Sequence, residues 1–271
     1  MAGRKSSQCS LLWSVINKEG EASYLFGTMH VRSHTAHQFL SGVLPYIAGT
    51  QIFAAEMNLQ QFDLKTMQES TTLSVEEGWY RHIKAQKFDK TRIALLKSFG
   101  IDLIHYKDRH PFLIMSAISE SLLAIDNMAS LDQELWNQAD KMGRTCTGLE
   151  SFFEQMDIMR RISVHDAFKQ IFEISRNPGQ FRKAMKKMIS YYVSQDVNRL
   201  YKASRRQLQG LRKIMLFNRN ERMVNRMEDL MFKETVFAGV GAAHLAGKQG
   251  MLSLLKKRGY KIRSMKINGR I

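Results

Sequence analysis

The strand-prone segments of this chain lie near its two ends, and the long stretch between them has helical periodicity. A short β-prone run at 22–26 ends at Gly27, and a second run at 51–55 ends at Glu56. The segment 37–47 between these runs carries apolar residues at helical spacing. A strand, a helix and a strand in succession predict a parallel βαβ unit with a right-handed crossover.

The carboxyl-terminal part returns to the same alternation. Residues 235–240 form an apolar run that is typical of a parallel strand buried on both faces. A helix is expected from about 241 to 258, with Gly259 as its cap, and a last strand is expected over 260–267. We expect these strands to join those of the amino-terminal part in one sheet.

Almost every segment from about 59 to 233 has the period of about 3.6 residues that is typical of helices. The sequence therefore predicts an α/β fold with a central, mostly parallel sheet built from both termini, at about 11–58 and 234–267. A large all-helical insertion over about 59–233 separates the two parts of the sheet. The chain of 271 residues is interpreted as a single domain over 1–271.

Positive charge is the main compositional bias. The chain has 41 Lys and Arg against 25 Asp and Glu, so its formal net charge is +16. Between 178 and 219 there are eleven basic residues and one acid, Asp196. We interpret this region chiefly as solvated helix faces, although it could also receive an acidic partner. The sequence has no zinc-finger or RRM signature and no alternation of aromatic and basic residues, which disfavours a nucleic-acid partner.

Other classes of protein are also disfavoured. No uncharged apolar run approaches the roughly 18 residues of a membrane-spanning helix, so no integral membrane segment is expected. The first ten residues are polar and the apolar run after them is too short for a signal peptide, which predicts a cytoplasmic location and leaves export open. Cys9 and Cys146 cannot form a disulfide framework, and Cys146 is interpreted as a small buried hydrophobe.

One pattern occurs twice, each time at the end of a predicted strand. It is Gly-x-x-His, with Gly27 and His30 in the first copy and Gly241 and His244 in the second. In an open parallel sheet, ligands bind in the crevice beyond the carboxyl ends of the strands, where Glu56 also ends a strand. Two imidazoles and a carboxylate suit a borderline divalent cation. A histidine after a strand is usually structural, so both interpretations stay open at this point.

Further short motifs follow one another in a fixed order along the chain. They are Leu-Leu-Trp at 11–13, the first Gly-x-x-His, Ala55-Glu56, a block at 131–155, Arg219-Asn220 and a closing segment at 240–261. In this order the motifs resemble the TraB/GumN family, whose relatives include PrgY and the Tiki proteins. The resemblance spans 11–261, and the basic run 178–213 has no counterpart in it.

The resemblance implies a metal-dependent hydrolase, peptidase-like as in the Tiki branch, that acts on a peptide or on a small ester or amide. It implies a divalent metal cofactor, with manganese or cobalt favoured over zinc. His30 and His244 would hold this cation, and Glu56 would be the third ligand or the base for a water molecule.

The remaining site residues are assigned on the same resemblance. Arg219 would hold a substrate carboxylate or stabilise an oxyanion. Glu150 would be a general acid or base, or a carboxylate that orients a histidine, unless it only caps the helix that follows it. The catalytic assignments are thus Glu56, Glu150 and Arg219, and substrate contacts are expected from Gly27, Asn220 and Gly241.

Two other functions stay open. The protein could bind and sequester a peptide or signalling factor without cleaving it, as PrgY-like members are thought to do with pheromones. It could also be a metal-independent esterase that resembles the erythromycin esterases, with a histidine as general base. Loss of activity with a chelator, and its return with manganese, would separate the metal enzyme from this esterase.

Overall fold

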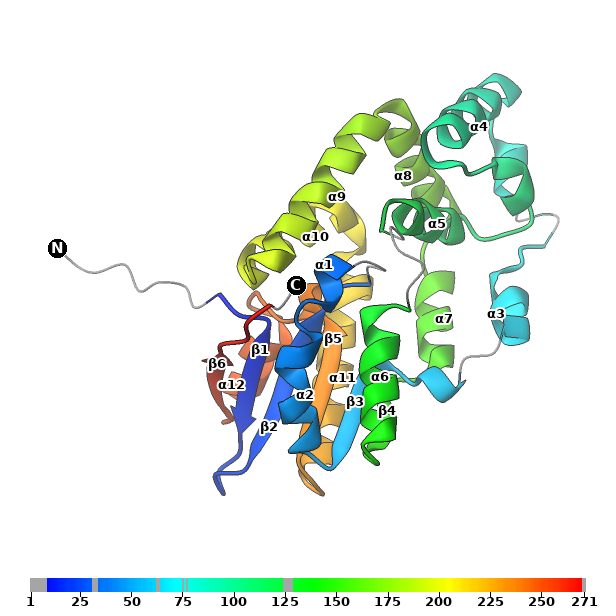
Figure 1. The fold of residues 1–271 in the computed structure, drawn as a ribbon. Helices are drawn as coiled ribbons and strands as arrows, with labels where there is room; N and C mark the ends of the chain where they lie inside the picture. Colours follow the sequence, from blue (N-terminus) through cyan, green and yellow to red (C-terminus); the bar gives the residue numbers. More distant parts are fainter. Residues whose placement is uncertain are drawn as a thin grey trace.

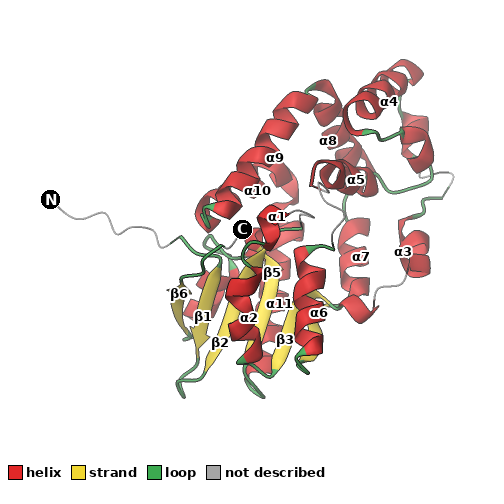
Figure 2. Cartoon of the chain, in the orientation of Figure 1, coloured by secondary structure: helices red, strands yellow, loops and turns green. Residues whose placement is uncertain are grey.

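One six-stranded sheet organises the fold (Figures 1 and 2). The computed structural model describes residues 9–30, 34–61, 64–74, 76, 78–123 and 129–269. The strand order is β4-β3-β5-β2-β1-β6. The strands are β1 (Leu12–Ile16), β2 (Ala22–Thr28), β3 (Ile52–Met57), β4 (Thr145–Glu150), β5 (Val236–Gly241) and β6 (Lys261–Met265).

The sheet is mostly parallel, as the sequence predicted. β2 pairs with β5, β5 with β3 and β3 with β4 in parallel, while β1 is antiparallel to β2 and β6. Gly20, in the turn between β1 and β2, has a φ of 89°, a left-handed conformation that costs glycine little. Because β5 lies between β2 and β3, strands from the two ends of the chain are neighbours. The α/β fold class is therefore confirmed.

The insertion at 59–233 contains a strand, which corrects the prediction that it is all-helical. β4 pairs with β3 at the edge of the sheet, with Cys146 opposite Phe53 and Glu150 opposite Met57. Its sequence, TCTGLE, has no strong apolar alternation. The strand forms because β3 is there to pair with it, and such a tertiary contact leaves little trace in local periodicity.

The helix expected from 241 to 258 is interrupted, which is a second correction. A 3-10 turn, η6 (Ala242–His244), follows β5, and α12 (Met251–Lys257) begins only after a loop. Gly247 has a φ of 95°. A Cβ on Gly250 would lie 2.2 Å from the Ala246 carbonyl oxygen. The chain can make this turn only because both positions are glycine.

Helices cover both faces of the sheet, and most of the insertion lies beyond the carboxyl ends of the parallel strands (Figure 1). α2 and α6 lie on one face, and α11 and α12 pack together on the other. The α-helices besides α12 are α1 (His34–His37), α2 (Leu40–Ala48), α3 (Leu64–Thr71), α4 (Ala85–Phe99), α5 (Phe112–Leu123), α6 (Leu131–Lys141), α7 (Phe152–Arg160), α8 (Val164–Arg176), α9 (Pro178–Val193), α10 (Val197–Leu208) and α11 (Asn218–Met231). Shorter turns are η1 (Leu59–Gln61), η2 (Trp79–His82), η3 (Leu103–Tyr106), η4 (Gln209–Leu211) and the π-helical η5 (Lys213–Phe217).

The helical insertion has a hydrophobic core of its own. The larger core surrounds the sheet and includes Phe53 and Phe237, whose rings are stacked. The smaller core gathers buried residues of α4, α5 and α8 around Trp79, whose ring stacks on Phe168. Within the described residues, no helix combines the length and the hydropathy needed to span a bilayer. Residues 1–8, on which the expected lack of a signal peptide partly depends, lie outside the described residues.

Gly148, in β4, allows β3 and β4 to approach each other closely at the edge of the sheet. A Cβ added there would lie 2.2 Å from the backbone nitrogen of Asn58, so Gly148→Ala forces β3 and β4 apart. We expect a loss of roughly 1–3 kcal/mol in the free energy of unfolding, measured by urea denaturation. Gly179→Ala is the control, because nothing lies within 4 Å of its Cβ position. Equal effects at the two positions would contradict the close approach at Gly148.

Candidate functional site

Four neighbouring parallel strands end at one edge of the sheet, and each brings a residue of the predicted site there. Glu150 is the last residue of β4, and Glu56 is the penultimate residue of β3. Gly241 ends β5 and leads into His244 in η6, while His30 follows the end of β2 by two residues. The carboxyl edge of a parallel sheet is where open α/β folds bind ligands.

Arg219 links the two glutamates at this edge. Its Nη2 donates to Glu56 Oε1 at 2.5 Å and to Glu150 Oε2 at 2.6 Å, and its Nε donates to Glu150 Oε2 at 2.9 Å. Arg222, one turn further along α11, donates to Glu150 Oε1 at 3.0 Å. The side chains of Glu56, Glu150 and Arg219 are almost fully buried. The site therefore contains a desolvated ion-pair network in which each carboxylate has a cationic partner.

Glu56 stays ionised despite its burial. Desolvation by itself would raise the pKa of this carboxyl group, but the Arg219 guanidinium, His244 and His30 together hold the pKa well below its usual value. The Gly241 N–H also donates to Glu56 Oε2 at 2.8 Å. Glu56 is thus a fixed carboxylate with one oxygen on Arg219 and the other facing His244.

His244 is held in one tautomer. Its Nδ1 donates to Asn220 Oδ1 at 2.6 Å, and the Asn220 amide nitrogen donates to the Gln249 carbonyl oxygen at 2.6 Å. Burial lowers the pKa of His244 to about 4, so the ring is neutral at pH 7. Its Nε2 then carries a lone pair and lies 3.9 Å from Glu56 Oε2. Two electron-rich atoms therefore face each other without a proton between them.

His30 has an acidic partner that the sequence did not identify. Its Nδ1 donates to Asp132 Oδ2 at 2.8 Å, and the Thr28 hydroxyl donates to Asp132 Oδ1 at 2.6 Å. The negative charge of Asp132 raises the pKa of His30 to about 9. The His30 side chain is 64% exposed, so solvent screening reduces what this pair contributes to stability. Asp132 lies on α6. The sequence had placed it within the motif block at 131–155 but had given it no role in the site.

The structure brings Glu56 and His244 together and places His30 within electrostatic range of both. Among the residues that the structure describes, however, no three or more His, Cys, Asp or Glu side chains are grouped as ligands of one metal ion. His30, Glu56 and His244 thus share one edge of the sheet without forming a compact ligand cluster. Their role as metal ligands stays a prediction.

The residues assigned to substrate contacts have internal partners. A Cβ on Gly27 would lie 2.7 Å from Leu245 Cδ1, so Gly27 lets β2 pack closely against the segment after β5. Gly241 donates its N–H to Glu56, and Asn220 orients His244. These three residues shape the site from within, and contact with a substrate stays a prediction for each of them.

Glu150 does not cap the helix that follows it. Ser151 is the N-cap of α7, where its hydroxyl and the Glu154 carboxylate form a capping box. Glu150 is left to pair with Arg219 and Arg222. The interpretation of Glu150 as only a helix cap was therefore wrong, because the cap belongs to the neighbouring serine.

A scan against protein-family models gives one decisive match. The TraB/PrgY/gumN family matches residues 11–264. The chain belongs to the TraB/PrgY/gumN family. A search of curated proteins and a search of solved structures each found no match. The family resemblance drawn from the sequence motifs is therefore confirmed over almost the same span.

Two arginines of this TraB/PrgY/gumN family member were missed in the sequence. Arg222 contacts Glu150, and Arg226 pairs with Glu154 through two hydrogen bonds of 2.6 and 2.8 Å. With Arg219 they have the spacing of three and four residues that places side chains on one face of a helix. That spacing is the signal by which they could have been found.

The other residues singled out in the sequence lie outside this network. Cys146 is in the first half of β4 and packs against the core, and burial raises the pKa of its thiol to about 11. It is a protonated cysteine that is half-buried, whereas a buried one was expected from the sequence. The basic region at 178–219 exposes lysines and arginines along α9 and α10, whereas Arg219 at its end is buried. An acidic partner for the exposed part stays a prediction.

The two site histidines should give stability a maximum near pH 6.5. Between pH 4 and 6.5, His244 is protonated in the unfolded chain but neutral in the folded protein. The free energy of unfolding therefore rises with pH over this range. From pH 6.5 to 9 folded His30 keeps a proton that the unfolded chain loses, so stability falls. Urea denaturation measures the free energy of unfolding over this range. In His244→Asn its rise between pH 4 and 6.5 should be smaller, and in His30→Asn its fall between pH 6.5 and 9 should be smaller. If both variants keep the pH dependence of the wild type, the opposite pKa shifts of the two histidines are contradicted.

Proposed function

We propose that this protein is a divalent-metal-dependent hydrolase of amide or ester bonds, acting on a peptide or a small ester or amide. The observation that supports it best is the 3.9 Å gap between His244 Nε2 and Glu56 Oε2. The first atom carries a lone pair and the second a negative charge, so a cation is the natural occupant between them. His30 offers a third donor once it releases its Nε2 proton.

The donor set suits a metal in a second respect. The Nδ1 of each histidine is hydrogen-bonded to an oxygen, Asp132 for His30 and Asn220 for His244. Metal-binding histidines are usually fixed in this way, because the outer hydrogen bond selects the tautomer that presents Nε2. Imidazole and carboxylate ligands together suit manganese, cobalt or zinc, with manganese or cobalt favoured by the family resemblance. When bound, such a cation supplies a Lewis acid and lowers the pKa of a coordinated water to ~7.

Glu56, Arg219 and Glu150 would each have a separate role in the proposed hydrolysis. Glu56 lies where it can accept a proton from a water molecule beside His244. Arg219 keeps Glu56 ionised and holds Glu56 and Glu150 in place, and its fixed positive charge can stabilise negative charge that develops on a substrate carbonyl. Glu150 pairs with both Arg219 and Arg222, so its proposed role is to orient Arg219.

Chelation followed by reloading tests this function. The protein is stripped with a chelator, reloaded with manganese, cobalt or zinc, and assayed on a quenched fluorescent peptide library and on nitrophenyl butyrate. We expect activity to disappear on stripping and to return with manganese or cobalt. Hydrolysis that survives stripping would contradict the metal and point to the esterase mechanism. Peptide retention without cleavage in every metal form would point to sequestration.

Asp132→Asn should weaken metal binding without removing a proposed ligand. The amide cannot hold the Nδ1 proton of His30 as a carboxylate does, and loss of such a partner typically costs 10–100-fold in metal affinity. Isothermal titration with manganese measures the change. Asp229→Asn, at an exposed position of α11, is the matched control and should bind like the wild type. Equal affinity in Asp132→Asn would argue against His30 as a ligand.

A further inference from the structure

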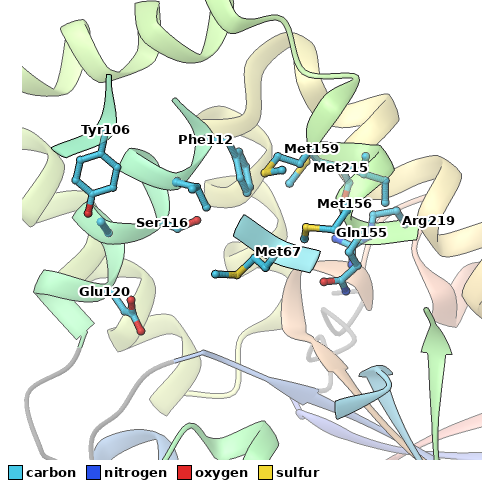
Figure 3. Close-up of a pocket in the computed structure, with 13 residues that line it drawn as sticks. Met67, Tyr106, Phe112, Ser116, Glu120, Gln155, Met156, Met159, Met215 and Arg219 are labelled. Carbon is cyan, nitrogen blue, oxygen red and sulfur yellow. Dashed lines mark hydrogen bonds between the residues drawn. The ribbon is translucent and has the colours of Figure 1, made fainter. Parts of the chain in front are cut away.

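A cavity of about 460 Å³ lies within the helical insertion, next to the candidate site (Figure 3). It is lined by residues of α3, α5 and α7, with contributions from η3, η5 and the start of α11, and it is partly open to solvent. Its volume falls within the range of about 300–1,000 Å³ that is typical of small-molecule sites. No local pattern in the sequence indicates this cavity, because its walls come from segments far apart in the chain.

The cavity and the polar network share residues. Arg219 lines one end of the cavity with its side chain, while its guanidinium binds Glu56 and Glu150. Gln155 lines the same end, and its amide lies 3.5 Å from Glu150 Oε2. Figure 3 shows Arg219 and Gln155 on one side of the cavity and Tyr106 and Glu120 on the other. A ligand that fills the cavity therefore reaches the edge of the sheet where hydrolysis is proposed.

The walls between these two ends are apolar and adaptable. Four methionines line the cavity: Met67 from α3, Met156 and Met159 from α7, and Met215 from η5. Methionine side chains are unbranched and flexible, so such walls can follow the shape of a flexible apolar chain. A peptide backbone inside them would leave several N–H and C=O groups without partners, each at a cost in free energy. An aliphatic chain has no such groups to satisfy.

We propose that the cavity binds the acyl chain of the substrate, with the acyl carbonyl at the Arg219 end. This deepens the proposed function, on which it rests, by naming the substrate class as an N-acyl or O-acyl compound with an aliphatic chain. In its hydrolysis water adds its oxygen to the carbonyl carbon, and the carbon–nitrogen or carbon–oxygen bond breaks. The leaving amine or alcohol takes the proton, and the products are a carboxylic acid and that amine or alcohol.

Binding of a fatty acid to the metal-free protein tests the cavity without any need for hydrolysis. The probe is cis-parinaric acid, whose fluorescence rises when it leaves water for an apolar site, and dodecanoate is the competitor. We expect saturable binding that dodecanoate displaces. An apolar peptide that displaces the probe where dodecanoate does not would overturn the acyl assignment.

Variants on one helix locate the bound probe. Ala117→Phe fills the cavity from α5 and should weaken probe binding at least about tenfold, the loss of roughly two buried methylenes. Ser121→Phe, at an exposed position of the same helix outside the cavity lining, should bind like the wild type. Met67→Gln places an amide in the apolar wall with little change in volume and should weaken probe binding about tenfold. This variant tests the proposal if Ala117→Phe does not fold. Wild-type binding by both cavity variants would overturn the proposal.

A series of nitrophenyl esters with acetyl, butyryl, octanoyl and dodecanoyl chains separates this proposal from the proposed function. With the metal-loaded protein, kcat/KM should rise by about fourfold for each methylene that enters the cavity, and Ala117→Phe should flatten the series. If no ester is hydrolysed but the probe binds as expected, the hydrolase fails and the acyl site stands. If esters are hydrolysed without dependence on chain length and the probe does not bind, the acyl site fails and the hydrolase stands.

Discussion

Arg219→Met is expected to lower the free energy of unfolding by about 3–5 kcal/mol, the largest stability effect of any single substitution in the site. The change removes the shared cation of Glu56 and Glu150, whose side chains are 11% and 0% exposed. Two carboxylates would then be left in a desolvated site, where Arg222 and the Gln155 amide still contact Glu150. Urea denaturation at pH 7 measures the loss.

The pH dependence of this loss separates the electrostatic role of Arg219 from its role in packing. In the wild type the pKa of Glu56 is depressed, so its contribution to stability is present above its ordinary pKa and disappears as the pH falls. In Arg219→Met, protonation of Glu56 instead removes a buried charge that has lost its partner, so the deficit in the free energy of unfolding should shrink as the solution is acidified. Arg206→Ala, at an exposed position of α10, is the control and should stay within about 0.5 kcal/mol of the wild type. A deficit that does not depend on pH would show that Arg219 acts through packing alone.

His30→Ala and His244→Ala are expected to abolish hydrolysis and metal uptake while the circular dichroism spectrum stays native-like. Each change removes one Nε2 from the proposed ligand set. His244→Ala also leaves Asn220 without its partner, at a cost of about 1–3 kcal/mol, so spectra and melting curves must accompany the assay. Elemental analysis after manganese loading reports the metal, and the peptide and ester assays report activity.

A third histidine serves as the matched control for these two. His165 lies at the start of α8 with its side chain 86% exposed, outside the network at the sheet edge. His165→Ala should keep both metal uptake and activity. Full activity in His30→Ala and His244→Ala would remove the proposed metal site, whereas retained peptide binding without metal would favour a sequestering protein.

The convergence of the candidate site residues at one edge of the sheet could be predicted from the sequence, because it follows from strand direction. Gly-x-x-His after two strands and Glu56 at the end of a third must meet if the strands are parallel neighbours, since parallel strands end at the same edge. The pairing of β2, β5 and β3 satisfies this condition. The partners of these residues could not be predicted in the same way. Asp132 reaches His30 across 102 positions of the chain, and Arg219 reaches Glu56 across 163.

The sequence alone determined the α/β class, the family and the edge of the sheet at which the chemistry is proposed, because apolar periodicity and residue order are local properties that the chain carries before it folds. Only the tertiary structure decided that 145–150 forms an edge strand, that Arg219 is buried between two glutamates, and that methionines from three described segments line one cavity. These features depend on packing between distant segments, and the free energy of such contacts has no local pattern in the sequence.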